Sequence, residues 1–63
     1  MEITLKSSRI NAGLTQEEAA KRIGITKDTL SNYERGKSFP DVPIIKKIED
    51  AYGIPYSNLK FLL

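Results

Sequence analysis

One segment near the middle of the chain carries polar side chains that can match hydrogen-bond donors and acceptors on a planar ligand edge. Asn32 can donate and accept at once, Lys27 can only donate, and an ionised Asp28 can only accept. At about 100° per residue, Leu30 and Tyr33 lie on one side of a helix through this segment. The opposite side then presents Asp28, Ser31, Asn32 and Arg35, with Lys27 at its edge.

Two short helices joined by a tight turn should position this polar face. Thr15 and Glu18 form a capping box, in which each side chain accepts a hydrogen bond from a free backbone N–H, so a helix of about eight residues begins at Thr15. Gly24 ends that helix, and Thr26 caps the next one, which Gly36 closes. Apolar residues occupy the staple positions at both starts, Leu14 with Ala19 and Ile25 with Leu30. The pattern predicts a helix-turn-helix, whose second helix can enter the roughly 12 Å wide major groove of DNA.

On this hypothesis the polar face would read base edges. Asn32 could make the paired contact that recognises adenine, Lys27 could donate to guanine O6 and N7, and Asp28 could accept from cytosine N4. For each side chain taken alone, the simpler interpretation is a solvated residue on an exposed helix face. Asp28 ranks below the other two, because a carboxylate in the first turn already favours the positive end of the helix dipole and is repelled by phosphates.

Contacts to DNA phosphates should come from residues that border the second helix. Gln16 stands at the first position of its own helix, where free N–H groups and the helix dipole attract an anion. Arg35, Lys37 and Ser38 lie at the far end of the second helix and in the loop that follows it. Four other basic residues are interpreted as parts of solvated faces: Lys21, Arg22, Lys46 and Lys47.

The rest of the chain predicts three more short helices and no strand, so the expected fold is all-α with five helices in a single domain over residues 1–63. The first helix covers about Thr4 to Ala12, with Leu5 and Ile10 facing inward and Gly13 as its stop. A fourth helix runs from about Val42 to Tyr52 after an Asp41 cap, and a fifth follows Pro55 and carries Leu59 and Leu62. The inward face of the fourth helix is expected to hold Val42, Ile45, Ile48, Ala51 and Tyr52.

Composition narrows the classes of function. The 63 residues include no Cys and no His, which argues against disulfides, the usual zinc sites and the commonest catalytic bases, so no metal or cofactor is expected. The paired acids Glu17 with Glu18 and Glu49 with Asp50 are adjacent, so they point about 100° apart on a helix and suit solvation better than catalysis. No apolar run could span a membrane, and a cytoplasmic protein is expected. The net charge of +2 permits a polyanionic partner.

The stretch from Gly13 to Asp41 resembles the phage repressor and Cro helix-turn-helix family, also called XRE-like regulators. The matching positions are Leu14, Thr15, Gln16, Ala20, Ile23, Gly24, Ile25, Leu30, Tyr33, Glu34 and Gly36. The resemblance extends over nearly the whole chain. It implies a lambda-repressor-like domain of five helices that binds double-stranded DNA in the nucleoid and regulates transcription, with a phage or mobile element as its expected source and repression as its expected role.

The resemblance also implies roles for individual residues. Arg9 and Glu34 match positions that pair as ions inside such domains, so neither is assigned to base reading. The family's phosphate binders match Gln16 and the loop around Lys37, and its base readers match Lys27, Asp28, Thr29, Ser31 and Asn32. The chain departs from the family at Ser7 and Ser8, where a larger apolar residue is frequent; packing of the first helix is looser there, or its register differs by one residue.

A homodimer on a palindromic operator is expected, because one short helix reads too few base pairs to outcompete non-specific DNA. The half-sites should lie about 34 to 36 Å apart, and dimerisation could be confined to DNA. Phe61 and Leu63 either complete the core or join the dimer contact. The chain is interpreted as a whole Cro-type protein or an excised N-terminal domain, with no small-molecule substrate. The alternative is an antitoxin or protein-interaction adaptor, against which the polar reading face argues mildly.

Overall fold

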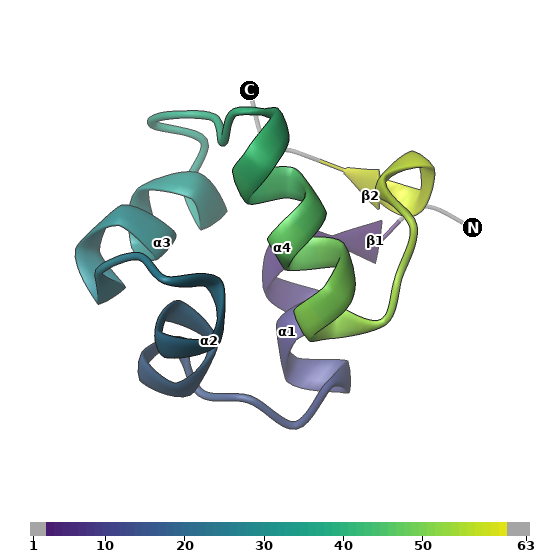
Figure 1. Ribbon diagram of the computed structural model, residues 1–63, viewed down its shortest axis with the longest axis horizontal. Coiled ribbons are helices and arrows are strands. Elements are labelled where there is room, and N and C mark those ends of the chain that lie inside the picture. Colours follow the sequence, from purple (N-terminus) through teal and green to yellow (C-terminus); the bar gives the residue numbers. More distant parts are fainter. Residues whose placement is uncertain (1–2, 61–63) are drawn as a thin grey trace.

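Four polar residues begin the four α-helices in the computed structural model, which describes residues 3–60. In each case the side chain accepts a hydrogen bond from the backbone N–H three residues later, as expected for Thr15, Thr26 and Asp41 and found also at Thr4. The elements follow one another as β1 Ile3–Thr4, α1 Leu5–Asn11, α2 Gln16–Ile23, α3 Lys27–Glu34, α4 Val42–Tyr52, the 3-10 helix η1 Tyr56–Asn58 and β2 Leu59–Lys60 (Figure 1). The all-α helix-turn-helix fold class is confirmed.

The capping box at the start of α2 is complete. The Glu18 backbone N–H donates to the Thr15 hydroxyl at 3.1 Å, and the Thr15 backbone N–H donates to the Glu18 carboxylate at 3.0 Å. This last hydrogen bond is the main reason that the pKa of Glu18 lies below its usual value. At the other end of α2, Gly24 adopts a φ of 85°, a left-handed conformation that residues with a side chain rarely adopt. The predicted start and stop of α2 are therefore both confirmed.

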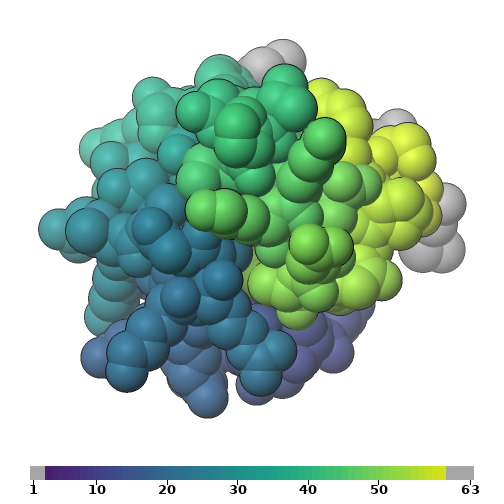
Figure 2. All heavy atoms as spheres, viewed as in Figure 1, coloured from purple at the N-terminus to yellow at the C-terminus, as the bar shows by residue number. Residues whose placement is uncertain are grey.

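The core is built from α2, α3 and α4, with Leu5 of α1, Leu14 before α2 and Leu59 of β2 also buried in it. Ile23, Leu30 and Ile48 are its largest fully buried side chains, one from each helix. In the space-filling view, α4 covers the middle of one face, with α2 and α3 on one side and the segment around η1 and β2 on the other (Figure 2). This packing buries the face of α3 that carries Leu30 and leaves the opposite face at the surface.

Two apolar residues expected to face inward lie on the surface. Ile10 is 56% exposed and Val42 is 65% exposed, so both expectations are wrong. At 100° per residue, Ile10 lies about 140° from Leu5, and Val42 lies about 120° from Ile48, so both fall outside the buried stripes. On α1 the buried stripe continues through Ser8, whose hydroxyl donates to the Leu5 carbonyl at 2.8 Å.

The expected fifth helix is also wrong. After Pro55 the chain forms only the three-residue helix η1 and then strand β2, which pairs in parallel with β1 (Figure 1). Ile3 pairs with Leu59, so the sequence prediction of no strand is corrected as well. A helix this short is costly to nucleate, whereas pairing with β1 gives the backbone hydrogen-bond partners and leaves Leu59 buried. Phe61, Leu62 and Leu63 lie outside the described residues.

Candidate nucleic-acid interface

The turn between α2 and α3 sets the angle of α3. The backbone N–H groups of Gly24 and Ile25 both donate to the Ala20 carbonyl, at 2.8 and 3.0 Å, which closes the end of α2 before Thr26 caps α3. Ala20 is 3% exposed and Ala19 is fully buried, and their small side chains leave room for α2 to pack against its neighbours. The packing of α2 against α3 holds α3 in place on the core.

The outward face of α3 holds the residues that the sequence proposed for base reading. Lys27 and Asp28 are exposed, and Ser31 and Asn32 are half-buried, while Leu30 points into the core. The Asn32 carbonyl Oδ1 accepts a hydrogen bond from Arg35 Nη2 at 3.1 Å. A carbonyl oxygen has two lone pairs, so this bond orients the Asn32 amide and still leaves a second acceptor site and the amide N–H groups for a ligand.

Thr29 is less available than the other proposed readers. Its hydroxyl lies 2.8 Å from the Thr26 hydroxyl, and its backbone N–H donates to the same Thr26 oxygen at 3.1 Å. The side chain is half-buried within the first turn of α3. A ligand that contacted the Thr29 hydroxyl would therefore have to share it with the helix cap.

A buried polar network ties α1, α2 and α3 together beneath this face. Arg9 Nε donates to Glu34 Oε2 at 2.7 Å, and Arg9 Nη1 donates to the Leu14 carbonyl at 2.8 Å. The other carboxylate oxygen of Glu34 accepts from Arg9 Nη2 at 3.4 Å and from Gln16 Nε2 at 3.0 Å. Arg9 is 7% exposed and Glu34 is 6% exposed, so the two charges compensate each other away from water.

The bond to Glu34 changes what Gln16 can offer a phosphate. One N–H of its side-chain amide donates to the Glu34 carboxylate at 3.0 Å, which orients the group and leaves the second amide N–H for a ligand. The backbone N–H groups of Gln16 and Glu17 belong to the first turn of α2, where no preceding helical carbonyl can accept them. These backbone groups are therefore donors that remain available to an anion at this helix start.

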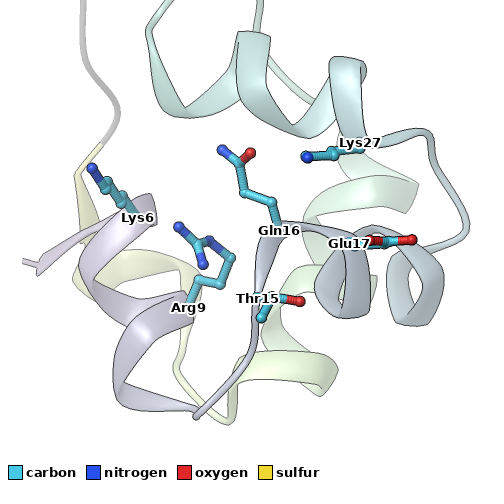
Figure 3. Close-up of a pocket in the computed structure, with 6 residues that line it drawn as sticks. All are labelled: Lys6, Arg9, Thr15, Gln16, Glu17 and Lys27. Carbon is cyan, nitrogen blue, oxygen red and sulfur yellow. The ribbon is translucent and has the colours of Figure 1, made fainter.

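Two adjoining hollows lie between α1 and α3 on either side of Gln16. The first is lined by Lys6, Arg9, Thr15, Gln16, Glu17 and Lys27 (Figure 3). The second is lined by Lys6, Gln16, Ser31, Glu34 and Arg35. We refer to both together as the α1–α3 groove. In the close-up, Lys6 and Lys27 stand on opposite sides of Gln16, and the Lys27 side chain reaches toward the Gln16 amide (Figure 3).

The loop after α3 supplies the remaining proposed phosphate contacts. The Lys37 backbone N–H donates to the backbone carbonyl of Asn32 at 2.9 Å, and the Gly36 backbone N–H donates to the backbone carbonyl of Tyr33 at 3.3 Å. These two bonds close the C-terminal end of α3. The Lys37 side chain is exposed and Ser38 is half-buried. The chain directly after α3 thus holds Arg35, Lys37 and Ser38. The proposed dimer residues Phe61 and Leu63 lie outside the described residues.

A protein-family model described as helix-turn-helix matches residues 5–59 of the chain. The chain belongs to the helix-turn-helix family. The similarity to phage repressors that the sequence suggested is thereby confirmed. No solved structure gives a significant match.

Regulators from bacteria, a phage and an archaeon are similar to this helix-turn-helix protein. The transcriptional regulator ImmR of Bacillus subtilis is 42% identical over 50 residues, which cover 79% of this chain and 39% of ImmR. The cryptic phage CTXphi transcriptional repressor RstR of Vibrio cholerae is 34% identical over 87% of this chain and 50% of RstR. An uncharacterized HTH-type transcriptional regulator of Methanothermobacter thermautotrophicus is 33% identical over the full chain and 91% of its own length. The chain thus spans half or less of the first two relatives.

In this helix-turn-helix protein, Lys6 lies at the proposed interface although it was not predicted there from the sequence. It lines both hollows of the α1–α3 groove. A signal was present, because Lys6 precedes Arg9 by three positions, and residues at that spacing share one face of a helix. Other types of site find no support here: residues 3–60 hold no acidic cluster that could bind a metal ion, and none of the helices described is long and apolar enough to cross a bilayer.

Tyr52 gives the helix-turn-helix core a testable dependence on pH. Its hydroxyl is buried without a hydrogen-bond partner among the described residues, and burial, with a further contribution from Glu34, raises its pKa to about 12. An unfolded tyrosine releases its proton near pH 10, so between about pH 10 and 12 the folded state binds more protons. The free energy of unfolding, measured by urea titration, should therefore fall as the pH rises through this range.

The matched variant is Tyr52→Phe, which lacks the titrating group. Below pH 9 it should be as stable as the parent or more stable, because it removes a polar group that lacks a partner. The difference between parent and variant should then grow between pH 10 and 12 in favour of the variant. A constant difference over that range would mean that the phenol is solvated in the folded protein.

Proposed function

We propose that this protein binds double-stranded DNA sequence-specifically and regulates transcription, acting as a repressor on a palindromic operator. The observation that carries the proposal is the polar face of α3, which projects from a rigid helix-turn-helix with its opposite side anchored by Leu30 in the core. Membership of the helix-turn-helix family supports the proposal, as does similarity to a transcriptional regulator and a phage transcriptional repressor.

Base reading is assigned to α3. The side-chain amide of Asn32 can form two hydrogen bonds with adenine while Arg35 keeps its hydrogen bond to the side-chain oxygen of Asn32. Lys27 and Ser31 flank this position with a cation and a hydroxyl, and Asp28 can accept a hydrogen bond from cytosine. Thr29 is the weakest of the five candidates, because its hydroxyl is engaged in the cap.

Phosphate binding is assigned to both ends of the unit. The backbone N–H groups of Gln16 and Glu17 point out of the start of α2, where the helix dipole favours an anion. At the C-terminal end of α3, the phosphates of a DNA strand are bound by Arg35, Lys37 and Ser38. Such contacts fix the register of α3 on the duplex without reading sequence.

Two copies of the chain would bind one operator together as a dimer. A few base contacts worth about 1 to 3 kcal/mol each do not distinguish an operator from the excess of non-specific DNA, whereas two half-sites do. A dimer with α3 in successive major grooves needs half-sites about 34 to 36 Å apart. Phe61 and Leu63 remain the proposed dimer contacts.

The test is selection of bound duplexes from a random DNA pool, followed by titration of the enriched sequence and a scrambled one at two salt concentrations. Enrichment of a palindrome with half-sites one helical turn apart would support a dimeric operator reader. If no sequence is enriched and binding is weak and strongly salt-dependent, the protein does not read DNA, and the adaptor or antitoxin interpretation takes its place.

Two substitutions separate base reading from phosphate binding. Asn32→Ala should cost about 1 to 3 kcal/mol of discrimination at one or two base pairs of each half-site, measured by titrating operators that carry single base changes. Lys37→Ala should instead weaken binding to all sequences alike and make the salt dependence shallower. If Asn32→Ala left the sequence preference unchanged, α3 would not read bases through this residue.

A further inference from the structure

The net charge of the chain resides in the α1–α3 groove. The residues that line its two hollows include four basic and two acidic side chains, a net charge of +2. The whole chain also has a net charge of +2, so its other basic and acidic residues balance. An anionic ligand that approaches this groove therefore meets a net positive charge.

Within the groove the charges are not equivalent. Arg9 is neutralised by Glu34 at 2.7 Å and is buried, so it contributes little net attraction. The Glu17 carboxylate points away from Gln16 in the close-up (Figure 3). Lys6 is exposed, and no ion pair joins it to an acidic residue within residues 3–60. It is also the one exposed basic residue of the groove that belongs neither to α3 nor to the segment after it.

The position of Lys6 is also central. It lines both hollows together with Gln16, whose side chain is held by its bond to Glu34. A ligand that occupied both hollows would therefore contact Lys6 as well as the start of α2 and α3. A DNA strand that lies beside a major-groove helix can take this position, because its phosphates border the groove that the helix enters.

We propose that Lys6 is a phosphate-binding residue of the DNA interface, which holds one phosphate of the strand that runs along the α1–α3 groove. This inference rests on the proposed function and extends it to α1. Lys6 adds affinity without sequence preference, because an ammonium group on a phosphate reads no base edge. It also brings α1 against the duplex beside α2 and α3.

The test compares Lys6→Gln with the parent on the enriched operator and on scrambled DNA between 50 and 200 mM salt. A dimer on DNA carries two Lys6 residues, so the substitution removes two phosphate contacts and makes the slope of log affinity against log salt shallower by about 1.8. The advantage of the parent dimer should therefore shrink about twelvefold as the salt rises from 50 to 200 mM, equally for both DNAs. Lys46→Gln is the matched control, because Lys46 is exposed on α4 and lines neither hollow, and it should keep the parental slope.

A second measurement locates the contact. Operators that carry one uncharged methylphosphonate at successive positions should include one position in each half-site that weakens the parent but has no further effect on Lys6→Gln. Lys6→Arg should restore the parental pattern, and thermal unfolding of all three variants should match the parent. If the parent reads its operator while Lys6→Gln and Lys46→Gln behave alike, this inference is overturned and the proposed function stands. If no DNA sequence is enriched at all, both are overturned.

Discussion

Replacing Glu34 by Gln should lower the free energy of unfolding by about 3 to 5 kcal/mol, measured by urea or thermal unfolding. The substitution keeps the shape of the side chain but leaves the Arg9 guanidinium charged and 7% exposed with no compensating carboxylate. It also weakens the hydrogen bond that Gln16 donates. A 63-residue domain has little stability in reserve, so a substantial fraction of the variant should be unfolded at 37 °C.

Two further proteins show whether the uncompensated charge is the cause. Glu17→Gln makes the same chemical change at an exposed site and should alter stability by less than about 1 kcal/mol. The double variant Arg9→Met, Glu34→Leu removes both charges and should recover much of the loss, because apolar side chains of similar volume often replace a buried ion pair at little cost. If Glu34→Gln were as mild as Glu17→Gln, Arg9 would have to reach water when its partner is neutral.

Ile48→Ala should cost about 2 to 5 kcal/mol in the same unfolding measurement. Ile48 is fully buried on α4 and, with Ile23 and Leu30, forms the centre of the core. Truncation removes three carbon atoms from that centre and leaves a cavity that the fixed helices around it only partly fill. Binding to DNA should weaken only to the extent that the variant is unfolded, because Ile48 lies outside the α1–α3 groove.

Val42→Ala is the matched control on the same helix. The sequence pattern places Val42 and Ile48 on one inward face, whereas the structure leaves Val42 65% exposed. Its truncation should therefore change stability by no more than about 0.5 kcal/mol. A loss comparable to that of Ile48→Ala would show that Val42 is buried in solution, either in the core or against another molecule.

Helix boundaries could be predicted because their signals are local. Thr15, Thr26 and Asp41 cap their own helices, and Gly24 needs only its own φ of 85° to end α2. The polar face of α3 followed from the same local geometry, since Leu30 fixes which side is buried. The family resemblance and the capping pattern thus placed the helix-turn-helix without knowledge of tertiary contacts.

The remaining features depend on contacts between distant segments. The inward face of α1 turns toward Ser8 and Arg9 instead of Ile10, because Arg9 must reach Glu34 in α3. The bond from Gln16 to Glu34 joins residues 18 positions apart, and no local pattern encodes it. The spacing of three puts Lys6 on the same face of α1 as Arg9, but the groove that Lys6 lines exists only where α1 and α3 lie side by side. Strand β2 likewise exists only because β1 lies next to it.

The parallel pairing of β1 with β2 has a consequence for the order of folding. It joins Ile3 to Leu59, 56 positions later, whereas α2 packs on α3, its neighbour in sequence. Closing a long loop costs more chain entropy than closing a short one, and contacts distant in sequence slow folding. The helix-turn-helix should therefore assemble first and the two strands should join last. In native-state hydrogen exchange, the amides of β1 and β2 should lose protection by partial opening while those at the centre of α2 remain protected until the whole domain unfolds.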